Sequence, residues 1–181
     1  AVLGNHDAGT YHPGYDAAGR DTNIAKLSVL IESSGYTLLN DTNTVIRTGK
    51  AEIGIAGVIT RGRRLDITYG DPVKSMAGLD STDFNILISH DPNHWKKEIT
   101  GKTKADLTLA GHTHGMQAGI ITKRFRWSPA ALVFPNWNGL YRSGDQYLYV
   151  NRGLGVRSVP FRIGMPPEIT VIRLTGETIN R

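Results

Sequence analysis

Short apolar runs that end near a histidine recur along the chain and predict how it folds. Residues 83–88 and 106–110 each have the composition and length of a buried strand, and residues 1–3 resemble the end of another. The histidines that follow these runs are His6, His90 and His112. Because sites in open α/β sheets lie at the carboxyl ends of the strands, we expect these histidines to share one site.

The rest of the pattern predicts a mixed α/β chain. Apolar positions between residues 24 and 31 recur at helical spacing after the capping sequence Asp21-Thr22-Asn23, so we expect an amphipathic helix packed on a sheet. Asp71-Pro72 predicts a second helix as far as Leu79, and residues 93–99 predict a third, with His94 on its surface. Further strands are predicted at 36–39, 44–47 and 52–58 (the latter two as a hairpin), 116–121, 146–151 and 168–174, the last at an edge.

Composition fits one globular domain over residues 1–181, with 39% hydrophobic and 20% charged residues. The chain has no cysteine, so we expect neither disulfides nor thiolate metal ligands. A net charge of +5 favours anionic substrates or an anionic membrane surface. No basic stripe interleaved with aromatic residues is present, so we expect no specific nucleic-acid binding. We leave open a cytoplasmic or a membrane-associated location.

Two candidate metal-binding histidines lie one residue apart in the segment Gly111-His112-Thr113-His114-Gly115. Imidazole is the commonest metal ligand near neutral pH, and alternate residues of an extended backbone share a face. Both rings can therefore serve one metal or two adjacent metals, or be two solvated histidines in a loop. The loop of residues 8–20 follows the first histidine motif and is either a substrate gate or an ordinary surface loop.

Three motifs in this order resemble the later motifs of the calcineurin-like metallophosphoesterases: Gly4-Asn5-His6-Asp7, Ser89-His90-Asp91-Pro92 and Gly111-His112-Thr113-His114-Gly115. Residues 147–155 and 167–170 are similar to the bacterial phosphohydrolases of that family, which hydrolyse phosphomonoesters or phosphodiesters. The resemblance implies an α/β fold, a four-layer α-β-β-α sandwich, here lacking its N-terminal strand-helix-strand part.

The resemblance also implies a two-metal site in which metals polarise the phosphoryl group and lower the pKa of a bound water. Asn5, His90 and His112 correspond to ligands of the second metal, and His114 to a ligand of the first. His6 corresponds to the general acid that protonates the leaving oxygen. Asp7 beside it would orient the ring and favour the imidazolium. The metals would be Zn, Mn, Fe, Ni or Co.

The family's first two motifs, Asp-x-His and Gly-Asp-x-x-Asp, do not occur in this sequence. We therefore expect the chain to be a C-terminal portion of a longer enzyme, with weak or partial metal binding and little or no activity by itself. Uncovered core and a free strand edge would favour homo-oligomers.

The expected substrate is a phosphate ester, which could be lipid-linked, and the arginines Arg152, Arg157 and Arg162 are candidate contacts for its anion. Alternatively, these arginines only keep the surface soluble. The basic, aromatic segment 123–129 could touch lipid or fold over the core. The alternative function is a non-catalytic module that binds anions or lipid headgroups.

Overall fold

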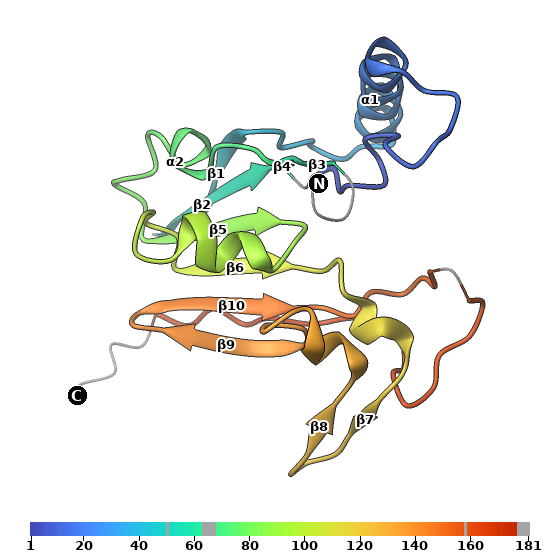
Figure 1. The fold of residues 1–181 in the computed structure, drawn as a ribbon. Helices are drawn as coiled ribbons and strands as arrows, with labels where there is room; N and C mark the ends of the chain where they lie inside the picture. Colours follow the sequence, from blue (N-terminus) through green and yellow to red (C-terminus); the bar gives the residue numbers. More distant parts are fainter. Residues whose placement is uncertain (50, 63–67, 158, 177–181) are drawn as a thin grey trace.

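Six strands form the central sheet of the computed structural model, which describes residues 1–49, 51–62, 68–157 and 159–176 (Figure 1). In spatial order they are β1 (Thr42–Thr48), β2 (Ala51–Val58), β5 (Phe84–Ser89), β6 (Leu107–Ala110), β10 (Gln146–Val150) and β9 (Gly139–Ser143). Two small sheets pair β3 (Thr60–Arg61) with β4 (Thr68–Tyr69), and β7 (Ile120–Ile121) with β8 (Arg126–Trp127). The helical elements are α1 (Ala17–Ser33), α2 (Pro72–Ser75), the π-helix η2 (Trp95–Ile99) and the 3-10 helices η3 (His114–Gln117) and η4 (Pro129–Leu132).

The four inner strands β2, β5, β6 and β10 are parallel, and the edge strands β1 and β9 pair antiparallel with their neighbours. The predicted strands 83–88, 106–110 and 146–151 and the hairpin 44–58 are therefore confirmed. Because parallel strands run in one direction, the segments that follow β5 and β6 leave the sheet at the same edge.

One face of the sheet carries the packed core. Ala56, Val58, Leu87, Leu148 and Val150 point to this face and are fully buried. They pack with residues from the segments that hold α2 and η2: Met76, Leu79, Trp95, Ile99 and Ala105. Asp71 caps α2 by accepting a hydrogen bond from the Lys74 amide at 2.9 Å, as the sequence predicts, although the helix ends four residues earlier than expected.

The opposite face of the sheet is apolar and only half-buried. The residues of β5 alternate strictly, with Asn85, Leu87 and Ser89 buried while Phe84 and Ile86 are intermediate. Within the described residues the structure shows one large sheet and no second sheet packed face to face on it. The α/β class is thus confirmed, and the four-layer sandwich stays a prediction.

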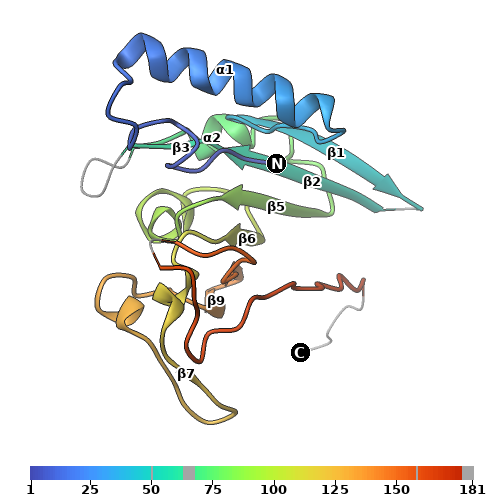
Figure 2. The same ribbon diagram turned by 90° about the vertical axis from the view of Figure 1, so that its right-hand side faces the viewer.

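Helix α1 starts earlier and is more exposed than the pattern predicts. Its cap is Asp16, whose Oδ1 accepts from the Gly19 amide at 2.8 Å, in place of residues 21–23. None of its residues is buried, and Leu30 is 61% exposed. It lies at the β1 end of the molecule, away from β9 (Figures 1 and 2).

Several predicted strands are wrong because their backbones form no strand ladder within the described residues. Ala1 donates to Thr37 O at 2.6 Å and accepts from Leu39 N at 2.8 Å, and Leu3 O accepts from Thr60 N, but residues 1–3 do not form a strand. Residues 36–39 and 168–174 also lie outside any strand, and 116–121 is strand only in β7. Strand β9 is not among the strands predicted from the sequence, and it forms because hydrogen bonding to β10 overrides its glycine and polar residues.

None of the helices in the described part of the chain has the length and apolar character needed to cross a bilayer.

Candidate functional site

Two histidines and a buried amide meet where β5 and β6 end. His90 follows β5 directly and His112 lies two residues beyond β6. Their rings are perpendicular, with His112 Nδ1 3.1 Å from His90 Nε2. The same His90 nitrogen lies 3.1 Å from the Oδ1 of Asn5, which is fully buried. Strand order thus brings together three of the predicted ligands from distant parts of the sequence.

The loop that carries His112 and His114 has an unusual backbone. His112 has φ 64° and His114 has φ 50°, both in the left-handed region that non-glycine residues seldom adopt. The loop is held by bonds from Gly111 N to His90 O at 3.0 Å and from Thr113 Oγ1 to Trp137 O at 2.7 Å. Such conformations cost free energy and cluster at functional sites, which supports a constrained role for both rings.

The first motif lies against the histidine rings. His90 is packed so closely on Gly4 that an added Cβ would lie 2.9 Å from its ring atoms, so the position excludes any larger residue. The motif also contributes His6 and Asp7 to a cavity of about 270 Å³, whose walls include all the predicted metal-binding histidines. The lining residues are Gly4, His6, Asp7, His90, His112, His114, Val156 and Arg157.

His6 is exposed and held by stacking rather than by Asp7. Its ring stacks on Tyr11 with centroids 4.3 Å apart. The Asp7 carboxylate instead accepts from the Gly4 amide at 2.8 Å, so its expected role of orienting the ring is not seen in a direct contact. Burial and then Arg157 lower the pKa of His6, and the smaller opposite effect of Asp7 does not restore it. Asp7 thus favours the imidazolium as expected, but burial and Arg157 outweigh its effect in this state.

The paired histidines are neutral at physiological pH. Burial, followed by the neighbouring His112, lowers the pKa of His90 to about 4. Burial, followed by Arg157, lowers the pKa of His112 to about 4. Neutral imidazole is the form that has a lone pair available for a metal ion.

His114 lines the same cavity but faces a cation. Its Nδ1 lies 3.4 Å from Nη2 of Arg162, and burial followed by Arg162 lowers its pKa. The positive charge of the guanidinium therefore disfavours a proton on this ring.

The three candidate arginines have different surroundings. Arg157 lines the histidine cavity. Arg152 forms an ion pair with Glu168, Nε to Oε2 at 2.7 Å, in which both side chains are largely buried. Arg162 donates to backbone carbonyls, among them Arg152 O at 3.1 Å and Gly153 O at 3.2 Å. Arg152 and Arg162 thus have structural partners, and Arg157 is the candidate that faces the site.

Two of the separations among Asn5, His90 and His112 are similar to those between ligands of one divalent metal ion. Two tetrahedral nitrogen ligands at zinc distances of about 2.0–2.1 Å lie roughly 3.3 Å apart, close to the 3.1 Å between His90 Nε2 and His112 Nδ1. Asn5 Oδ1 supplies a third donor at a similar separation. Within the described residues no three His, Asp, Glu or Cys side chains form such a group, so this donor set is completed by an amide and has no negative charge.

Four further residues surround the site: Tyr11 of the 8–20 loop, Asp91 of the second histidine motif, and Tyr69 and Phe134, which the sequence does not single out. Tyr11 places the 8–20 loop against the site, since Asn5 Nδ2 donates to its hydroxyl at 3.2 Å. Phe134 packs edge-on against His112. Asp91, directly after His90, is buried and accepts from the Tyr69 hydroxyl at 3.0 Å. Only their contacts across the fold reveal these roles.

His94 is buried rather than on the surface of its helix. Its Nδ1 lies 2.9 Å from Ser89 Oγ and its Nε2 lies 3.1 Å from Glu98 Oε2, while its ring stacks on Tyr69. Ser89 is fully buried, so this Ser-His-Glu arrangement is closed to substrates. It fixes η2 to the end of β5.

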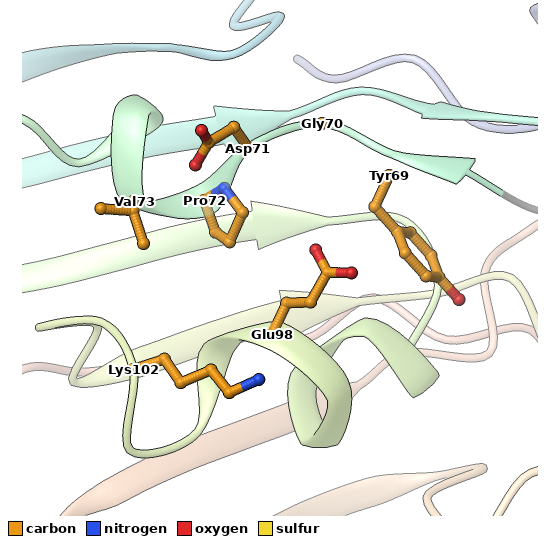
Figure 3. A pocket seen from close by; sticks show the side chains of 7 residues that line it. All are labelled: Tyr69, Gly70, Asp71, Pro72, Val73, Glu98 and Lys102. Atoms are coloured by element: carbon orange, nitrogen blue, oxygen red, sulfur yellow. The ribbon is translucent and has the colours of Figure 1, made fainter.

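A separate cavity of about 350 Å³ lies between α2 and η2 (Figure 3). Its lining combines Pro72 and Val73 with the charged groups Asp71, Glu98 and Lys102. Asp71 caps α2 and Glu98 binds His94, so both carboxylates already have structural roles. We assign no chemistry to this cavity.

Comparison with curated proteins found relatives described as metallophosphoesterases and a phosphodiesterase. The chain is 31% identical over 182 residues to the metallophosphoesterase YkuE of Bacillus subtilis, covering 96% of this chain and 54% of the relative. It is 25% identical to a metallophosphoesterase of Aquifex aeolicus, covering 98% of the chain and 60% of the relative. It is 27% identical to the phosphodiesterase YaeI of Escherichia coli, covering 96% of the chain and 57% of the relative.

The chain therefore spans little more than half the length of these relatives. No family model matches it, and no solved structure matches it.

Proposed function

This chain belongs to the calcineurin-like metallophosphoesterase family, and we propose that it carries part of the active site of a metal-dependent phosphoric ester hydrolase. The observation that supports this most strongly is the meeting of Asn5, His90 and His112, three neutral donors with ligand-like separations, at the carboxyl ends of two parallel strands.

Asn5, His90 and His112 would hold one divalent metal, and His114 would contribute to a second. When bound, such metals polarise the phosphoryl group and lower the pKa of an attacking water. Burial serves this role because it keeps both paired imidazoles unprotonated.

His6 would supply the proton to the leaving oxygen. It is exposed and lines the cavity, where Tyr11 fixes its plane. An incoming phosphate ester is an anion, and a nearby anion favours the protonated ring. Substrate binding would thus raise the pKa of His6 toward the range of a working general acid.

Arg157 would bind the phosphoryl oxygens. It lines the cavity beside these histidines, and its charge disfavours a proton on both His6 and His112. A guanidinium matches two phosphate oxygens at once, so we assign the substrate-anion contact to Arg157.

The finer architecture is also a proposal. The half-buried apolar face that contains Phe84 and Ile86 is the surface on which the second sheet of a four-layer sandwich would pack.

The test uses the longest natural form of the protein that contains this chain, supplied with Mn²⁺ and bis-p-nitrophenyl phosphate or p-nitrophenyl phosphate. We expect hydrolysis. His6→Ala should lower kcat by about 10²–10⁴ while metal content is kept. His112→Ala should reduce metal content.

His12→Ala is the matched control, because His12 is exposed in the same loop and does not line the cavity. If His6→Ala removes the metal, the assigned roles are wrong. Tight binding of phosphate without hydrolysis would instead indicate an anion-binding module.

A further inference from the structure

The hairpin formed by β7 and β8 projects from the body of the protein on the side away from α1 (Figures 1 and 2). Ile120 pairs with Trp127 and Ile121 pairs with Arg126 across its two strands. Directly paired residues share a face, so Ile120 and Trp127 lie on one face and Arg126 on the other.

The Arg126 face is turned toward the protein. Arg126 Nη1 donates to Asn138 O at 3.0 Å, and its guanidinium lies over the Tyr141 ring. The Ile120–Trp127 face is therefore turned outward, and these side chains are 55% and 46% exposed. Phe125, next to the turn, is 56% exposed.

A second segment adds apolar surface at the base of the hairpin. Residues 159–163 run beside residues 117–119, with bonds from Ile163 N to Gln117 O at 2.7 Å and from Gly119 N to Ile163 O at 2.9 Å. In this segment Phe161 is 54% and Ile163 61% exposed. Clustered exposed apolar side chains of this kind mark an interaction surface.

The side chains around the hairpin carry a net positive charge. Lys123 and Arg124 occupy the turn, are exposed, and have no carboxylate partner within the described part of the chain. Residues 107–167 contain seven Lys and Arg and one carboxylate, Asp145, whereas the whole chain has 21 and 16. The net positive charge of the protein thus belongs to this region.

We propose that the β7–β8 hairpin docks on an anionic lipid bilayer, with Phe125 and Trp127 entering the interface and Lys123 and Arg124 meeting the lipid headgroups. Exposed aromatic and aliphatic side chains beside unpaired cations are the composition that such surfaces bind. A tryptophan with one exposed edge suits the boundary between headgroups and acyl chains.

Docking would set the orientation of the histidine site. Only two residues separate η3, which contains His114, from the start of the hairpin, so the site and the bilayer contact are joined by a short segment. A lipid-linked phosphate ester is then the substrate class that this geometry favours. That consequence rests on the proposed hydrolase function, whereas docking does not.

Trp127 reports on docking directly. Of the three tryptophans, Trp95 and Trp137 are 3% and 5% exposed, so a shift in emission on membrane contact comes from Trp127. With vesicles of phosphatidylglycerol and phosphatidylcholine we expect co-sedimentation, a blue shift, and quenching by brominated acyl chains. Vesicles of pure phosphatidylcholine should bind at least tenfold more weakly, and higher salt should weaken binding to the anionic vesicles.

The variant Lys123→Glu/Arg124→Glu should reduce partitioning to anionic vesicles by at least about 25-fold, since each cation near such a surface contributes roughly fivefold. Phe125→Ala/Trp127→Ala should reduce it by at least about tenfold. Lys26→Glu/Leu30→Ala is the matched control, because it changes one exposed cation and one exposed apolar residue on α1, which lies on the side of the protein away from the hairpin. It should bind as the parent does.

Equal binding by parent and hairpin variants would overturn the proposal. So would a concentration-dependent dimer in light scattering that the hairpin variants abolish, because the surface would then contact a second copy. Both readouts are independent of hydrolysis, so failure of docking and failure of the proposed activity are distinguished.

Discussion

The ring of His90 lies against Gly4 so closely that any side chain at position 4 would collide with it. A Cβ built there would be 2.9 Å from the Cγ, Cδ2 and Cε1 atoms of His90. The glycine of the first motif and the histidine of the second are thus one packing unit, although 86 positions separate them along the chain.

Gly4→Ala should therefore displace His90 and weaken the site. We expect a loss of about 1–3 kcal/mol in the free energy of unfolding from overpacking, together with lower Mn²⁺ affinity. Urea unfolding and calorimetric titration measure the two effects. Gly155→Ala is the control, because a Cβ at Gly155 meets no atom within 4 Å. Unchanged affinity in Gly4→Ala would contradict the packing argument.

The stability of the metal-free protein should fall as the pH is lowered from 7.5 to 5.5. The pKa of His90 and of His112 is about 4 in the folded chain and near 6.5 when unfolded, so the unfolded state binds more protons in this range. Their stabilising contribution is complete above pH 6.5 and is lost as the pH falls toward 4. We expect roughly 1 kcal/mol per histidine over this interval.

Urea midpoints measured in EDTA test this, and His112→Asn should show a smaller pH dependence than the parent. A midpoint that does not change between pH 7.5 and 5.5 would show that the two rings are not buried as a neutral pair.

Removing the buried ring of His94 should destabilise the fold. His94→Ala leaves a cavity under Tyr69 and an unpaired Ser89 hydroxyl, which together cost about 2–4 kcal/mol. His12→Ala, at an exposed histidine, should cost less than about 0.5 kcal/mol. Chemical denaturation measures the loss of unfolding free energy in each variant. Equal losses in His94→Ala and His12→Ala would refute the structural role of His94.

Tyr11 should affect catalysis through stacking rather than through its hydroxyl. Tyr11→Phe keeps the ring that stacks on His6 and removes the 3.2 Å bond from Asn5, so we expect kcat within about threefold of the parent. Tyr11→Ala frees His6 and should lower kcat tenfold or more, since small misplacements of catalytic groups are costly. Tyr36→Ala, at an exposed tyrosine, is the control. Equal effects of Phe and Ala would overturn this assignment.

The Arg152–Glu168 pair should be coupled far more strongly than a surface pair. Its side chains are 14% and 12% exposed, and Glu168 also accepts from the Tyr149 hydroxyl. A double-mutant cycle to alanine should give about 1–3 kcal/mol of coupling. Arg47–Glu52, with side chains 74% and 40% exposed, should give about 0–0.5 kcal/mol. Similar coupling in the two pairs would mean that Arg152 is free to bind substrate.

The sequence alone predicts the parts of this protein that depend on local pattern. Short, mainly apolar segments mark β5, β6 and β10 because strands buried within a parallel sheet have few polar positions. The histidines that follow β5 and β6 could be placed at one edge because parallel strands end on the same side. The family resemblance of the three motifs is likewise a property of sequence and is confirmed by the comparisons.

The tertiary structure alone decides what depends on partners distant in the sequence. The left-handed backbone of His112 and His114 is imposed by loop contacts such as Thr113 to Trp137, which no local propensity encodes. The sequence does not distinguish Arg152 from Arg157. In the structure Arg152 pairs with Glu168, whereas Arg157 lines the cavity. Likewise, residues 168–174 alternate as a strand does but pair with no strand in the described part of the chain, because pairing between strands depends on the fold as a whole.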